Sequence, residues 1–114
     1  MNKFKHGDIV LVRFPFTDLK SSKLRPALVI SSRGEDLIVV GIFSRIPDEI
    51  KNTWVVISEE IQDFSKTGLK KTSITKTEKI ATIHHTIVSR KLGKLPSNLL
   101  DQVNQALKRA LELR

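Results

Sequence analysis

Three short apolar runs follow one another near the start of the chain, and they predict neighbouring β-strands. The runs span residues 9–14, 27–30 and 37–43, are rich in Val and Ile, and are bounded by Gly, Pro, Ser or Asp, as strands typically are. The second and third runs are apolar at almost every position, so we expect both faces of these strands to be covered. Their connection has Gly34 at its centre, which predicts antiparallel pairing.

The rest of the chain predicts three further strands. Residues 52–57, 73–76 and 79–83 have the composition of strands, and the last two runs are separated by only a few residues. Together the six runs predict a small, strongly coiled and mainly antiparallel sheet or partial barrel.

Two helices are expected beside this sheet. A short helix should begin at Ser58, which is a suitable N-cap followed by two acidic residues, and should end before Gly68. A longer helix should cover residues 97–113, with basic residues near its end. Its apolar residues form a stripe that predicts packing on one face of the sheet: Leu99, Leu100, Val103, Ala106, Leu107, Ala110 and Leu111.

Residues 16–24 join the first two strands and have the period of neither helix nor strand. The segment is polar, which predicts a surface loop. A loop of this length beside a strand end can act as a lid or a gripping arm on a ligand, and a plain connection is an equal alternative.

Composition favours an anionic partner. The 114 residues suffice for one core, and we expect a single domain over 1–114. The 20 Lys and Arg against 12 Asp and Glu leave a formal charge of +8, which suits a nucleic-acid backbone or an acidic protein segment. A basic surface that serves only solubility is the alternative.

Several classes of protein are disfavoured. The chain has no cysteine, so disulfides and thiolate metal sites are excluded. Its longest apolar run is far too short to span a bilayer, and Asp8 and Arg13 interrupt the apolar stretch near the N-terminus, so neither a membrane protein nor a signal peptide is expected. A soluble, cytoplasmic protein is the default expectation.

The three histidines do not predict a metal site. His84 and His85 are adjacent, and adjacent residues on a strand point to opposite sides, so we expect their imidazoles not to converge on one ion. The pair could act as a general acid or base, although a surface histidine pair is the more common arrangement. We expect neither a metal nor a cofactor.

The clearest candidate site lies at the ends of the second and third strands. Arg25 precedes Pro26 at the start of one strand, and Ser44 and Arg45 follow the other. Antiparallel pairing brings them to the same edge of the sheet, where we expect them to be neighbours. A guanidinium matches the geometry of phosphate, and RNA carries its own nucleophile in the 2′-OH, so cleavage needs little beyond a group that stabilises the phosphorane. The alternative is a surface Arg with a Ser that caps the strand.

These segments resemble a known family. GDIVLVRFPF, RPALVIS and LIVVGIFS, followed by GLKKTSI, KIATI, LGKLP and an amphipathic terminal helix, resemble the MazF/PemK-like (Kid-like) toxins of bacterial type II toxin–antitoxin systems. The resemblance covers essentially the whole chain. It implies an SH3-like β-barrel and metal-independent endoribonuclease cleavage of single-stranded RNA at short sequences, in which the 2′-OH attacks and a cyclic phosphate remains.

The resemblance also implies roles for single residues. Arg25 matches the family's catalytic arginine in the RP motif, and Ser44 falls where many members have a catalytic Thr. Some members use an Arg and an Asp two residues apart, at places that here hold Lys76 and Glu78, although Lys does not give the bidentate contact of Arg. Further candidates for contact with RNA are Arg45, Thr17, Lys20 and Lys23.

The family implies partners as well. They are a second copy of the chain in a homodimer, RNA that lies across the interface beside residues 16–24, and an acidic antitoxin that competes for the same basic surface. Two other functions stay open at this point. One is a toxin of the same fold that binds gyrase, and the other is an inactive relative that serves only as a nucleic-acid-binding or protein-binding module.

Overall fold

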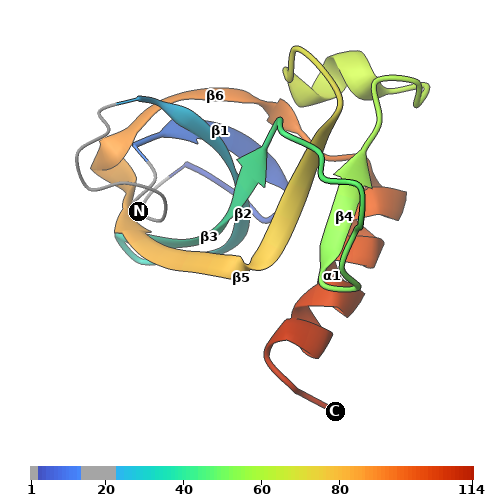
Figure 1. Cartoon of the computed structure of the whole chain (residues 1–114). Coiled ribbons are helices and arrows are strands. Elements are labelled where there is room, and N and C mark those ends of the chain that lie inside the picture. Colours follow the sequence, from blue (N-terminus) through green and yellow to red (C-terminus); the bar gives the residue numbers. More distant parts are fainter. Residues whose placement is uncertain (1–2, 14–22) are drawn as a thin grey trace.

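The computed structural model describes residues 3–13 and 23–114, which form a six-stranded antiparallel sheet and a C-terminal helix (Figure 1). The elements in chain order are β1 (Asp8–Val12), β2 (Arg25–Arg33), β3 (Asp36–Phe43), β4 (Trp54–Ile57), η1 (Phe64–Thr67), β5 (Ser73–His84), η2 (His85–Ile87), β6 (Val88–Lys94) and α1 (Ser97–Ala110), where η marks a 3-10 helix. No helix in the described ranges is both long enough and apolar enough to cross a membrane.

The sheet is strongly coiled, as the sequence predicts (Figure 1). Its strand order is β4-β5-β3-β2-β1-β6, so the sequence-distant β1 and β6 lie side by side. The edge strands β4 and β6 are not paired with each other in the part of the chain described. The result is a partial, SH3-like barrel that is not closed by hydrogen bonds.

The central strands are covered on both faces, as expected from their continuous apolar runs. On one face, Leu28 of β2 and Val40 of β3 pack in a cluster with Val103 of α1. On the other face, Val29 and Val39 pack in a second cluster around β1. Successive side chains of a strand point to opposite faces, so one strand supplies residues to both clusters. The predicted packing of the terminal helix on the sheet is confirmed.

Two of the predicted strands are one strand. Residues 73–76 and 79–83 both belong to β5, which continues from Ser73 to His84. The residues between them do not end the strand, because they form a bulge within it. β6 has no counterpart in the prediction: it is an edge strand with mostly exposed polar residues, VSRKLGK, so it lacks the apolar pattern by which strands are recognised.

The short helix begins later than predicted. Residues 58–63 form an irregular segment of turns and a bend, and the helical segment is the single 3-10 turn η1. One of the two acidic residues expected at the helix start is engaged elsewhere: the Glu59 carboxylate accepts a hydrogen bond from the N–H of Thr72 at 3.0 Å, and the N–H of Glu59 donates to the Thr72 hydroxyl at 2.9 Å. Gly68 ends η1 in the left-handed conformation, as the sequence predicts.

β6 and η1 approach each other so closely that no side chain fits between them. A Cβ atom at Gly93 would lie 2.1 Å from the carbonyl oxygen of Lys66, and a Cβ atom at Gly68 would lie 2.1 Å from the carbonyl oxygen of Leu92. Both obstacles are backbone atoms, which cannot rotate away. Glycine at these two positions therefore fixes η1 against the sheet.

We expect Gly93→Ala to lower the free energy of unfolding by about 3 kcal/mol or more, because the methyl group must displace backbone atoms. Chemical denaturation followed by circular dichroism measures this change. The matched control is Gly34→Ala: Gly34 has a φ of +59°, and a Cβ atom there meets nothing within 4 Å. Its loss should be about 1 kcal/mol, from backbone strain alone. Equal losses in both variants would contradict the close approach.

Candidate functional site

A bulge in β5 positions several polar side chains. Val40 of β3 pairs with Ile80, whereas the next residue, Gly41, pairs with Lys76. Residues 77–79 are therefore extra residues on the β5 side of the ladder, and β5 bends there (Figure 1). Bulges of this kind re-aim side chains and are frequent beside functional sites.

Thr77 anchors the bulge. Its side chain is fully buried, and its hydroxyl donates a hydrogen bond to the carbonyl oxygen of Thr53 at 2.6 Å. The N–H of Thr77 reaches the same carbonyl at 3.1 Å. These bonds tie the bulge to the residue that precedes β4, so the side chains on either side of Thr77 have fixed positions.

A basic cavity of about 700 Å³ opens beside the bulge, and we call it the Arg25 cavity. Its walls come from the start of β2, the end of β3 and the segment after it, the start of β4, and the bend of β5. They combine four cationic side chains, two aromatic rings and a proline: Arg25, Arg45, Lys76, Lys79, Phe43, Trp54 and Pro47. Such a surface attracts anions and offers flat apolar faces to planar groups.

The strand register explains why Arg25 faces this cavity. Ala27 pairs with Gly41, so two residues further toward the start of β2, Arg25 lies opposite Phe43. Cross-strand partners share one face of a sheet. Phe43 and Arg25 therefore border the same space, in which Arg25 is a partly buried residue.

Lys76 lies between two aromatic rings. Its Nζ atom is 5.0 Å from the ring centroid of Phe43 and 4.5 Å from that of Trp54, both within the range of cation–π attraction. Trp54 also pairs with Lys76 across β4 and β5. The ammonium group is thus fixed in the wall of the Arg25 cavity.

Glu78 supports this arrangement through the N–H edge of the Trp54 ring. Its carboxylate accepts a hydrogen bond from Trp54 Nε1 at 2.6 Å and one from the Thr53 hydroxyl at 2.8 Å. Partial burial raises the pKa of Glu78, but the hydrogen bonds from Trp54 and Thr53 lower it more, so the net pKa lies below its ordinary value. The ionised carboxylate orients the indole ring. It does not itself line the Arg25 cavity.

Ser44 lies at the same edge of the sheet as Arg25, as expected, but it lines a different cavity. That space, of about 410 Å³, is bordered by Pro26, Ser44 and three basic residues, Lys70, Lys71 and Arg90. Ser44 follows the last residue of β3 and lines this second cavity, whereas Arg25 lines the first. Phe43, not Ser44, occupies the position across from Arg25.

The other residues expected at the site fall partly inside and partly outside the Arg25 cavity. Arg45 and Lys76 line the Arg25 cavity, whereas the exposed Lys23 does not. Thr17 and Lys20 lie outside the described residues, as does most of the segment 16–24. The sequence did not single out Phe43, Pro47 or Lys79. The pairing of β2 with β3 could have indicated that Phe43 lies beside Arg25. The position of Lys79 in the cavity wall depends on the bulge in β5, which the sequence did not predict.

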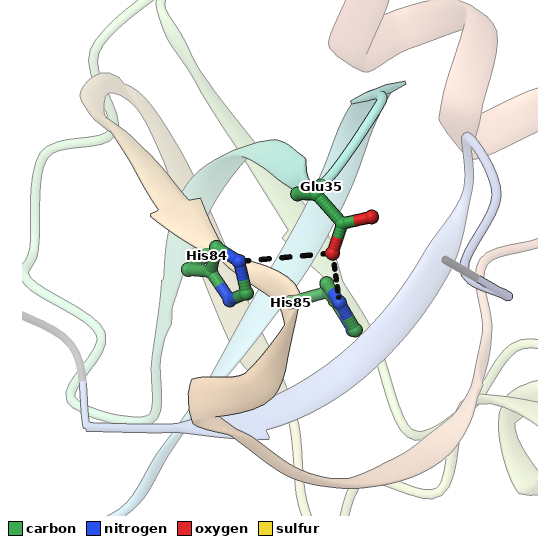
Figure 2. A group of neighbouring side chains, drawn as sticks. All are labelled: Glu35, His84 and His85. Carbon is green, nitrogen blue, oxygen red and sulfur yellow. Dashed lines mark hydrogen bonds and ion pairs between the residues drawn. The ribbon is translucent and has the colours of Figure 1, made fainter. Parts of the chain in front are cut away.

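The expectation for the two adjacent histidines is wrong. His84 is the last residue of β5 and His85 is the first residue of η2, so the alternation of a strand does not apply across the pair. The imidazole rings stack with their centroids 4.8 Å apart. Both rings point a nitrogen at the carboxylate of Glu35 (Figure 2). The two imidazoles therefore converge on one carboxylate, contrary to the expectation from the sequence.

Solved structures share this fold over nearly their full length. The chain is similar to an endoribonuclease in complex with its cognate antitoxin from a mycobacterial species, with 19% identity, a TM-score of 0.73 and 98% of each chain covered. It is also similar to the Mycobacterium tuberculosis toxin MazF-mt6, with 19% identity, a TM-score of 0.72 and coverage of 94% of this chain and 98% of that chain. The MazE–MazF complex of Deinococcus radiodurans matches with 16% identity, a TM-score of 0.70 and 96% of each chain. No curated protein sequence matches the chain.

The family comparison agrees with the fold. Residues 5–111, from the segment before β1 to the end of α1, match the family described as PemK-like, MazF-like toxin of type II toxin–antitoxin system. The match includes every strand of the sheet and every residue of the Arg25 cavity. The chain therefore belongs to the PemK-like, MazF-like toxins of type II toxin–antitoxin systems.

Proposed function

We propose that this toxin is an endoribonuclease that cleaves single-stranded RNA at short sequences without a metal ion, and that Arg25 is its principal catalytic residue. The observation that carries the proposal is the Arg25 cavity, in which an arginine and three further cations surround two aromatic rings. Cations bind the phosphates of single-stranded RNA and aromatic rings stack on its bases. The mycobacterial relative is itself an endoribonuclease.

The proposed reaction uses the nucleophile of the substrate. The 2′-oxygen attacks the adjacent phosphorus and loses its proton, the bond from phosphorus to the 5′-oxygen breaks, and the departing 5′-oxygen takes up a proton. The products are a cyclic phosphate and a 5′-hydroxyl. The Arg25 guanidinium donates hydrogen bonds to the phosphoryl oxygens, whose negative charge grows in the transition state. Lys76, held between its two rings, adds a second positive charge.

Other residues of the site have supporting roles. Arg45 and Lys79 bind neighbouring phosphates, and Glu78 keeps the Trp54 ring in a position where a base can stack on it. Ser44 contributes from the adjacent cavity by contact with the RNA strand as it passes over the edge of the sheet. Thr17, Lys20 and Lys23 are proposed to contact nucleotides that flank the cleaved bond.

We propose two protein partners in the cytoplasm. One is a second copy of the chain in a homodimer, with RNA across the interface. The other is an acidic antitoxin segment, which the formal charge of +8 favours electrostatically. The relatives with an antitoxin bound, among them the MazE–MazF complex, support the second partner.

Arg25→Ala should lower the cleavage rate about 100-fold or more, because removal of a group that stabilises an oxyanion has an effect of that size. A long single-stranded RNA is incubated with each protein in the presence of EDTA, and the new 5′ ends are mapped. The matched control is Arg33→Ala, which removes the same charge from the exposed, opposite end of β2 and should leave discrete cuts unchanged.

An Arg25→Ala protein as active as the parent would refute the assigned mechanism. RNA that remains intact with the parent protein would refute the activity itself. That result would point to a gyrase-binding toxin or to a binding module that lacks catalysis.

Ser44→Ala should lower the cleavage rate by no more than about tenfold, because Ser44 and Arg25 line different cavities and the lost contact is a single neutral hydrogen bond. The rate is measured with the same RNA under single-turnover conditions. A loss as large as that of Arg25→Ala would instead place the Ser44 hydroxyl in the chemical step.

Trp54→Ala should weaken RNA binding about 10-fold to 100-fold, the effect of losing one stacked base. Affinity is measured by fluorescence anisotropy with a short labelled RNA, in an Arg25→Ala background that prevents cleavage. Trp54→Phe is the matched control: it keeps a ring for stacking and loses the N–H that bonds Glu78. Equal affinities for all three proteins would show that no base stacks on this residue.

A further inference from the structure

A cluster of metal-ligating side chains lies far from the Arg25 cavity. Among residues 3–13 and 23–114, Glu35, His84 and His85 each offer one ligand atom, and these atoms lie within 4.8 Å of one another. Figure 2 shows the two imidazoles and the carboxylate pointing toward a common space. Glu35 precedes β3, whereas the histidines end β5 and begin η2.

We propose that Glu35, His84 and His85 bind a divalent transition-metal ion, with Zn²⁺ as the best match. Two imidazole nitrogens and one carboxylate oxygen form a ligand set that zinc uses in proteins, with water in the fourth position. This site is separate from the proposed ribonuclease chemistry and does not depend on it.

The distances are close to those that zinc requires. Glu35 Oε2 lies 2.8 Å from Nε2 of His85 and 3.7 Å from Nε2 of His84. Ligand atoms at the usual zinc bond lengths occupy the corners of a tetrahedron with edges of about 3.4 Å. Two edges are therefore nearly in place. The third, between the two imidazoles, closes by rotation of side chains that are partly exposed.

The backbone already holds the ligands together. The N–H of His85 donates a hydrogen bond to the carbonyl oxygen of Glu35 at 2.9 Å, and Asp36 pairs with His84 in the ladder of β3 and β5. Only side-chain torsions must adjust when an ion binds. Ligands whose backbone positions are already held by hydrogen bonds lose less conformational entropy on binding than ligands on free loops.

Thr86 provides the outer contact that metal-binding histidines usually have. The Thr86 hydroxyl lies 2.7 Å from Nδ1 of His84. When a metal ion occupies Nε2, the Nδ1–H donates to this hydroxyl, which fixes the tautomer and the ring orientation. The longer contact from the N–H of Thr86 to Nδ1, at 3.3 Å, belongs to the other tautomer.

Nearby charges set the expected affinity. Lys3, Arg90 and Lys91 line the adjacent cavity with His85 and oppose a cation there, although Asp8 pairs with Lys91 at 3.2 Å. We therefore expect a dissociation constant in the micromolar range.

The ion would raise the thermal stability of the folded chain. It joins the turn between β2 and β3 to the corner between β5 and β6. The cluster lies at the Asp36 end of β3, whereas the Arg25 cavity borders the Phe43 end. An ion that binds only the folded chain raises its melting temperature and leaves RNA cleavage intact.

The test is a titration of the full chain with ZnCl₂ at pH 7.5, followed by isothermal calorimetry and by thermal melting. We expect one ion per chain and a rise in Tm on the order of 5–10 °C when Zn²⁺ is at about 100 times the dissociation constant. Each of His84→Ala and His85→Ala should weaken binding at least about tenfold, and the double variant about 100-fold. Co²⁺ in place of Zn²⁺ should give the visible absorption of a tetrahedral site.

Two matched controls separate this site from general affinity for metal. His6→Gln removes the third histidine, and Asp36→Asn removes the acid next to Glu35; both should bind Zn²⁺ like the parent. The proposal is overturned if the parent shows no saturable binding, if the double histidine variant binds as well as the parent, or if His6→Gln loses as much affinity as His84→Ala.

Discussion

Burial of β3 on both faces is the constraint on which the rest of the structure depends. β3 pairs with β2 on one side and with β5 on the other, and Leu37, Val39, Val40 and Ile42 are almost completely buried. Chemistry with exposed polar groups is therefore confined to its two ends. The Phe43 end borders the basic cavity, and the other end borders the cluster of two histidines and a glutamate. The strand keeps these two sites apart.

The parts of the fold that the sequence predicted are those with a strong local pattern. The strands that became β2 and β3, their antiparallel pairing around Gly34, and the packed terminal helix all follow from continuous or periodic apolar residues. Edge strand β6 has no such apolar pattern, because most of its side chains are polar and exposed to solvent. The continuity of β5 and the late start of η1 depend on partners distant in sequence, Val40 in one case and Thr72 in the other.

The candidate site was predictable in part. Its location at the strand ends and its basic character follow from Arg25 and the RP motif. The family resemblance also pointed to Lys76, whose ammonium group lies between two aromatic rings in the structure. The pairing of Arg25 with Phe43 instead of Ser44 is a matter of register, and one residue of register decides which face a side chain takes. To predict that the two histidines converge, one must know that β5 ends at His84.

The pairing of β1 with β6 has a consequence for the chain as it is synthesised. Asp8 lies opposite Lys94, and the carbonyl oxygen of Gly7 accepts a hydrogen bond from the N–H of Leu95. The edge of β1 that pairs with β6 therefore has no partner until residues 88–94 have been synthesised. Native contacts of such long sequence separation form late, and bare strand edges recruit other chains. The order of strands therefore delays completion of the sheet until β6, its last strand in sequence order, has been made.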